Sequence, residues 1–117
     1  MTPESEELSA DDQKLVTLAR AARARIQALA GAAVRDETGR TYVGADVNLE
    51  CLRISAAELA VAQAVAAGAT SVAAIAIVGI LNGDWQTQVQ PVRELSGTGV
   101  TVVLAGRTGS VEMVATT

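Results

Sequence analysis

Apolar residues recur at helical spacing near the start of the chain. Ser9 stands just before this stretch, and Asp11 and Asp12 follow it, which is typical of a helix N-cap with acidic residues in the first turn. The apolar positions that share one face are Leu15, Leu18, Ala19, Ala22 and Ile26. The pattern predicts a helix over residues 10–28.

A second helix is predicted where Ser55 and Glu58 form the S-x-x-E pattern of a capping box. Strong helix formers continue from there to Ala67, and Gly68 ends the helix. Gln63 is the only polar side chain between Glu58 and Gly68, so the helix has no solvated stripe and needs cover on more than one side. We expect another subunit to supply part of that cover.

Apolar and β-branched stretches bounded by turn residues predict the strands. Residues 72–79 form a continuous apolar run, as expected of a strand buried on both faces between helices. The remaining elements are expected as a hairpin of 29–34 and 40–45, a short helix at 91–95, and strands at 100–104 and 111–115. Their order predicts an α/β domain of three layers with a mixed sheet of five strands.

The length of 117 residues fits one domain, and a chain of this size buries roughly two-thirds of its unfolded surface. Residues 1–8 are polar and acidic and contain a proline, so we expect a disordered lead-in followed by a single domain over 9–117. With one Trp, one Tyr and no Phe, the core must be built from small side chains that let backbones approach closely.

The net charge of −4 is concentrated at the start of the chain. The acids that precede the first basic residue are Glu4, Glu6, Glu7, Asp11 and Asp12. The only basic cluster, Arg20, Arg23 and Arg25, lacks aromatic stacking partners and is interpreted as a solvated helix face. We therefore expect no nucleic-acid partner.

No stretch of the sequence predicts a membrane span. The longest apolar run, Val72–Leu81, is about half of the ~20 residues that cross a bilayer, and no basic-then-apolar segment opens the chain. We expect no membrane association and a cytoplasmic location. The single cysteine, Cys51, cannot form an internal disulfide, and it is interpreted as a buried small side chain rather than a reactive thiol.

Three short stretches resemble the small cytidine deaminases. They are Gly31-Ala-Ala-Val34, Gly39-Arg-Thr-Tyr-Val-Gly44 and Ser55-Ala-Ala-Glu-Leu-Ala60, followed by Gly68 and the apolar strand. The resemblance covers roughly residues 12–115 in the family's order and approximate spacing. It implies a cytidine deaminase-like fold and a homo-oligomer, with a tetramer favoured.

The resemblance also implies a zinc site. In the family, a Cys-Ala-Glu tripeptide opens the second helix and a Pro-Cys-Gly-x-Cys segment opens the next; the three thiolates hold zinc and the glutamate moves protons. The tripeptide aligns here with Ala56-Ala57-Glu58, so the glutamate is kept while an alanine replaces the ligand.

The second ligand segment falls within Gln86–Pro91. Depending on register, the ligand pair aligns with Thr87 and Gln90 or with Gln88 and Pro91, and neither pair offers a thiolate. Because the sequence has no histidine and one cysteine, it cannot supply the nitrogen and sulfur ligands of such a site. We expect no metal and no other cofactor.

The residues that the resemblance places around the substrate are also changed. The Asn-x-Glu pair that grips the ribose aligns with Asp46-Val47-Asn48, and the phenylalanine that stacks on the base aligns with Ala28. Asp46 and Asn48 either hold a hydroxylated ligand or are ordinary turn formers. Glu58 is either a relic of the catalytic acid/base or the capping residue of the second helix.

Three functions are compatible with these features. We favour a catalytically silent cytidine deaminase-like protein that serves as an oligomeric binding or regulatory module, with Asp46, Asn48 and Glu58 as candidate ligand-binding residues. The first alternative is a nucleoside deaminase with residual or altered activity through Glu58. The second is a structural partner for another protein, contacted through Trp85, which is predicted on a loop as a partner anchor or as a lid over the pocket.

Overall fold

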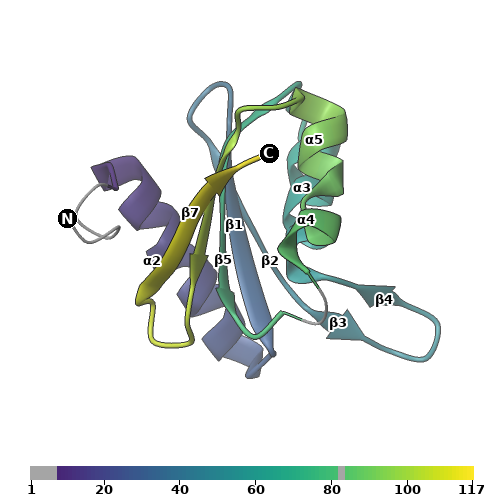
Figure 1. Cartoon of the computed structure of the whole chain (residues 1–117). Helices are drawn as coiled ribbons and strands as arrows, with labels where there is room; N and C mark the ends of the chain where they lie inside the picture. The colour runs from purple at the N-terminus through teal and green to yellow at the C-terminus, as the bar shows by residue number, and fades with distance from the viewer. Residues whose placement is uncertain (1–7, 82–83) are drawn as a thin grey trace.

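The computed structural model describes residues 8–81 and 84–117 of the chain (Figure 1). The elements in chain order are helix α2 (Ala10–Ile26), strands β1 (Ala30–Asp36), β2 (Thr41–Ala45), β3 (Val47–Asn48) and β4 (Arg53–Ile54), helix α3 (Ala56–Ala66), strand β5 (Val72–Gly79), helices α4 (Trp85–Gln88) and α5 (Gln90–Ser96), and strands β6 (Thr101–Ala105) and β7 (Val111–Thr116). Apart from Leu8, which packs against the core, the predicted disordered lead-in lies outside the described residues.

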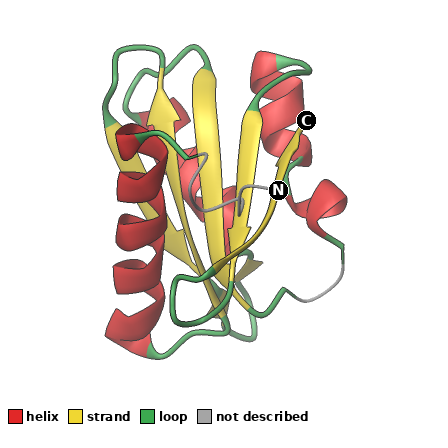
Figure 2. Ribbon diagram, turned by 60° about the vertical axis from the view of Figure 1, so that its left-hand side comes forward, coloured by secondary structure: helices red, strands yellow, loops and turns green. Residues whose placement is uncertain are grey.

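A mixed sheet of five strands forms the middle layer, in the order β2-β1-β5-β6-β7. Strand β1 pairs antiparallel with β2 and β5, β5 pairs parallel with β6, and β7 returns antiparallel on β6. Helix α2 covers one face of the sheet, and α3 and α5 cover the other (Figure 2). The predicted three-layer α/β architecture with a mixed five-stranded sheet is therefore confirmed.

Strand β5 contributes to both halves of the core. Ile75 and Ile77 point to the α3 side, where they pack with Ala60 and Val61. Ala74, Ala76 and Val78 point to the α2 side with Leu15. Because side chains alternate along a strand, a continuous apolar run is what a strand covered on both faces requires, and the predicted strand 72–79 has the observed bounds.

Two glycines allow the helices to approach the sheet closely. A Cβ built at Gly44 in β2 would lie 2.5 Å from the carbonyl oxygen of Ala56 and 2.7 Å from the backbone nitrogen of Ala60, both in α3. A Cβ at Gly31 in β1 would likewise collide with the backbone of α2, at Ala19 and at Arg23. Both glycines lie in stretches that carry the family resemblance, and each is needed for contact between layers.

The turn between β1 and β2 is fixed by two carboxylates. The buried Asp36 accepts hydrogen bonds from the backbone and hydroxyl of Thr38, from the Arg40 backbone and from the Tyr42 hydroxyl. Glu37 reaches across to the loop before β5, where it accepts from the backbone N–H groups of residues 70 and 71 and from a threonine hydroxyl. These hydrogen bonds join the turn to the loop between α3 and β5.

Some boundaries differ from the prediction. Helix α2 ends at Ile26 rather than at 28 because Gln27 adopts a left-handed conformation with φ of 52°. The ribbon of β3 and β4 was not predicted, since two-residue strands carry no detectable alternation. Among the described residues, no helix is long and apolar enough to span a membrane.

Candidate functional site

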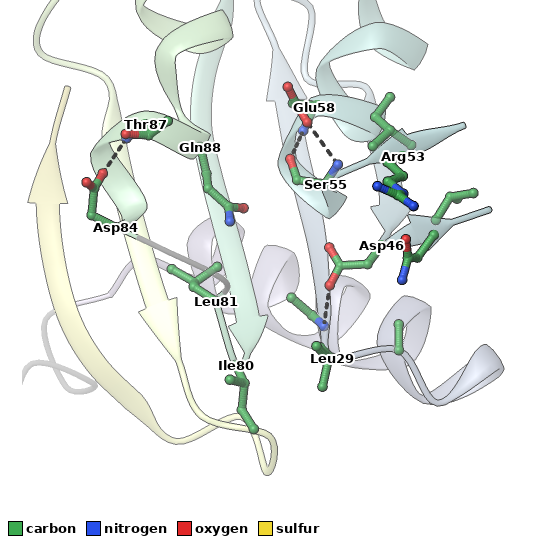
Figure 3. Close-up of a pocket in the computed structure, with 15 residues that line it drawn as sticks. Leu29, Asp46, Arg53, Ser55, Glu58, Ile80, Leu81, Asp84, Thr87 and Gln88 are labelled. Carbon is green, nitrogen blue, oxygen red and sulfur yellow. Dashed lines mark hydrogen bonds between the residues drawn. The ribbon is translucent and has the colours of Figure 1, made fainter. Parts of the chain in front are cut away.

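A cleft of about 640 Å³ opens at the end of the sheet where β1 begins and β5 ends (Figure 3). Its walls come from the segment before β1, the β3–β4 ribbon, the N-terminus of α3, and the segment from β5 to α4. The lining residues are Ala28, Leu29, Ala30, Asp46, Val47, Asn48, Arg53, Ile54, Ser55, Glu58, Ile80, Leu81, Asp84, Thr87 and Gln88.

Asp46 connects two walls of the cleft. One carboxylate oxygen accepts a hydrogen bond of 2.9 Å from the backbone N–H of Ala56, at the first turn of α3, and the other accepts one of 3.2 Å from the N–H of Ala30, at the start of β1. A carboxylate is favoured at a helix N-terminus, where backbone N–H groups lack partners. Asp46 therefore holds the start of α3 against the sheet.

Glu58 and Ser55 form a capping box at the same helix end. The Ser55 hydroxyl accepts from the backbone N–H of Glu58 at 3.1 Å, and a Glu58 carboxylate oxygen accepts from the backbone N–H of Ser55 at 2.9 Å. The capping interpretation of Glu58 is confirmed. Glu58 also lines the cleft, so its ligand-binding role stays a prediction.

The β3–β4 ribbon brings Asn48 and Arg53 to the cleft. These two residues are cross-strand partners in the antiparallel register, and both side chains are exposed. None of the described residues forms an ion pair with Arg53. The sequence comparison singled out Asn48 but missed Arg53, whose only signal is its place between the ribose-gripping positions and the capping box.

The opposite wall contains the segment that aligns with the second pair of metal ligands. Asp84 caps α4 by accepting a hydrogen bond of 2.7 Å from the Thr87 backbone N–H. Hydrogen bonds from the Thr87 backbone and hydroxyl lower the pKa of Asp84, against a smaller opposing effect of burial. Thr87 and Gln88 line the cleft, whereas Gln90 and Pro91 do not.

The residues present do not fit a zinc ion. The positions that would hold it are Ala56, whose methyl group is buried, and, depending on register, Thr87 and Gln90 or Gln88 and Pro91, none of which has a thiolate or an imidazole. The carboxylates that line the cleft, Asp46, Glu58 and Asp84, each accept hydrogen bonds from backbone N–H groups. Within the described part of the chain, no three or more of His, Cys, Asp and Glu cluster in a way that could hold a metal ion.

Two predictions about individual side chains were wrong. Cys51 is exposed at the tip of the β3–β4 ribbon rather than buried. Trp85 begins helix α4 rather than lying on a loop, and it packs partly buried against the core that includes α3. It does not line the cleft, so the lid interpretation fails, while a role as partner anchor stays untested. Short helices and ribbon tips leave little sequence signal.

Ala28, which the resemblance aligns with the base-stacking phenylalanine, lines the cleft together with the exposed Leu29 and Ile80. Apolar contact with a ligand is therefore possible on this wall, but ring stacking is not.

Comparisons with known proteins agree on the family. A family model described as cytidine deaminase-like matches residues 8–109. The crystal structure of cytidine deaminase from Burkholderia pseudomallei is similar with a TM-score of 0.75 and 28% identity, and the match covers 92% of each chain. Cytidine deaminase from Mycobacterium leprae shares the fold with a TM-score of 0.69 at 19% identity, over 92% of this chain and 94% of that one. None of the curated proteins matches the sequence significantly.

Proposed function

This chain belongs to the cytidine deaminase-like family, and we propose that it is a catalytically silent member that binds a nucleoside-like small molecule in the cleft. The observation that carries the proposal is a cleft of about 640 Å³ together with uncharged residues at the ligand positions, which are Ala56 and, depending on register, either Thr87 and Gln90 or Gln88 and Pro91. The shape of a small-molecule site is present, while the donors for zinc are replaced.

The chemistry of the lining suits a hydroxylated, uncharged ligand. Asn48 offers both a donor and an acceptor, and Arg53 offers donors without an acidic partner among the described residues. Leu29 and Ile80 add exposed apolar surface to the same lining. A few polar groups on a largely apolar wall are typical of small-molecule sites.

Hydrolytic deamination is not part of the proposal because nothing in the lining can activate water. A bound cation lowers the pKa of water to about 7 in zinc enzymes. Glu58 by itself cannot replace this effect, and its carboxylate is already hydrogen-bonded to the backbone of Ser55. The alternative, a deaminase with residual activity, becomes an outcome of the test.

Thermal unfolding with a panel of nucleosides tests the binding function. A nucleoside at 100 times its Kd should stabilise the chain by about 2.7 kcal/mol. The shift should be lost in Asn48→Ala, and it should persist in Glu94→Ala, since Glu94 is exposed on α5 and does not line the cleft. No shift with any nucleoside would leave only the structural-partner hypothesis.

Elemental analysis and an ammonia-release assay test catalytic silence. Protein purified without chelator should contain no stoichiometric zinc, and cytidine and deoxycytidine should not be deaminated above background. Turnover that disappears in Glu58→Gln would prove the enzyme alternative instead.

We also infer that the functional unit is a homo-oligomer, as expected from the sequence. The exposed side of α3 is apolar: Ala62 and Ala66 lie on it, and Val65 is 49% exposed. A second copy of the chain would supply the cover that this face lacks.

A further inference from the structure

A second hollow of about 620 Å³ lies beside the cleft. It is formed by the end of α2, the segment before β1, the residue after β5, and the turn between β6 and β7, which lie at the same end of the molecule (Figure 1). Its lining residues are Arg23, Ala24, Gln27, Ala28, Leu29, Ile80 and Arg107. We call it the arginine hollow.

The arginine hollow adjoins the cleft. Ala28, Leu29 and Ile80 line both, and the backbone N–H of Ile80 donates a hydrogen bond of 2.8 Å to the carbonyl oxygen of Leu29. This bond joins the two segments into one shared wall. The two spaces therefore lie side by side along this wall.

The two spaces differ in charge. The cleft is lined by three acids, Asp46, Glu58 and Asp84, and by one base, Arg53. The arginine hollow is lined by two bases and no acid. The C-terminus of α2 adds the equivalent of roughly half a negative charge, which is less than the two full charges of the guanidinium groups. An anionic group is thus disfavoured in the cleft and favoured in the hollow.

Arg23 is held in place by the sheet. A Cβ at Gly79 would lie 3.2 Å from its Cδ, and one at Gly31 would lie 2.8 Å from its Cβ, so the stem runs over the glycines of β5 and β1. Its Nε is buried without a hydrogen-bond partner. Arg20 and Arg25 are exposed, as predicted for a solvated helix face, whereas Arg23 is half-buried and departs from that prediction. Neither Arg23 nor Arg107 forms an ion pair with any described residue.

We propose that the arginine hollow is a phosphate subsite and that the ligand of the chain is a nucleoside monophosphate, with its sugar and base in the cleft and its phosphate between Arg23 and Arg107. The proposal rests on the proposed nucleoside-binding function. A guanidinium group matches a phosphate through paired N–H donors.

Calorimetric titration of cytidine, uridine and their 5′-monophosphates tests the subsite, with inorganic phosphate as a further probe. The better of the two monophosphates should bind at least about tenfold more tightly than its nucleoside. Arg107→Gln and Arg23→Met should each remove most of this gain and leave nucleoside affinity unchanged. Methionine retains much of the stem of Arg23, and Arg107 is exposed on a turn, so at least one variant should fold.

Arg25→Gln is the matched control, because Arg25 is exposed on α2 and lines neither space. It should keep the full phosphate gain, and added salt should weaken nucleotide binding more than nucleoside binding. Equal affinity for nucleoside and nucleotide, or equal losses in all three arginine variants, would overturn the subsite and leave the proposed function standing. Failure of nucleosides and nucleotides alike would overturn both.

Discussion

At the start of α3, individual side chains stabilise the fold at positions that the family resemblance aligns with catalytic and metal-binding residues. Ala56 presents a buried methyl group, Glu58 caps the helix, and Asp46 accepts one hydrogen bond from the helix and one from β1. The two carboxylates accept hydrogen bonds from three backbone N–H groups, those of Ser55, Ala56 and Ala30. A backbone N–H group without a partner costs free energy when it is buried. An alanine at position 56 is therefore compatible with a stable helix start.

Asp46→Asn should destabilise the chain, because an amide has only one acceptor oxygen for two backbone N–H groups. Leaving one donor without a partner costs about 1–3 kcal/mol. Asn48→Ala is the control, since Asn48 is exposed, and it should change the free energy of unfolding by less than about 0.5 kcal/mol. Urea unfolding at neutral pH measures both. Equal midpoints for Asp46→Asn and the parent chain would show that Asp46 is not structural, and would favour a ligand-binding role.

Residue roles were predictable where they depend on local spacing. The serine and glutamate of the capping box are three positions apart, and this spacing alone predicts their reciprocal bonds. The exposure of Cys51 and the burial of the Arg23 Nε were not predictable, because they depend on a ribbon and on glycines distant in sequence. The same applies to Arg107, which meets Arg23 only through the fold of the sheet.

At the scale of elements, periodicity predicted the large pieces and missed the small ones. The strand 72–79 and the helix that Ser55 caps have strong local patterns, and both lie where predicted. Helix α4 and the β3–β4 ribbon are too short for a pattern, yet they form two walls of the cleft. The fold was therefore more predictable than the site.

The turn between β1 and β2 makes stability depend on pH. Burial opposes ionisation of Asp36, but hydrogen bonds from Thr38, Arg40 and Tyr42 outweigh it and lower the pKa of this carboxyl. The pKa of Glu37 is also lowered, first by its own backbone N–H, against burial, and then by Ser71 and Thr70. The folded chain thus holds these carboxylates ionised to lower pH than the unfolded chain does.

Stability from these two groups should be present above their ordinary pKa values of 3.8 and 4.5 and should be lost as the pH falls through the lower folded values. Urea unfolding between pH 7 and pH 3 should show a smaller decline in the free energy of unfolding for Asp36→Asn and Glu37→Gln than for the parent chain. Glu94→Gln, on an exposed position of α5, should follow the parent curve. Parallel curves for all four proteins would contradict the role of the turn.

On the scale of the whole molecule, helices cover both faces of the sheet at β1 and β5, whereas none of the residues of β7 is buried and no described residue covers the outer side of α3. Helix α3 buries Ala56, Ala57, Ala60, Val61 and Ala64 against the sheet. Its other side shows Ala62, Val65 and Ala66 to solvent. A helix that is apolar around its whole circumference needs to be covered on both sides. Small side chains allow another helix to approach it closely. A symmetric contact between copies is the usual way to provide it.

Light scattering during gel filtration at micromolar concentration tests this assembly. We expect a particle of four times the chain mass of 11.9 kDa. Its assembly should depend on the exposed side of α3. Ala62→Glu places a charge on that side and should shift the chain to smaller species, whereas Ala21→Glu, at an exposed position of α2, should leave the assembly intact. A monodisperse particle of 11.9 kDa would defeat the proposal, and a dimer would leave only the tetramer wrong. If Ala62→Glu stayed fully assembled, the contact would have to lie on another face, such as the edge strand β7 with its exposed Met113 and Val114.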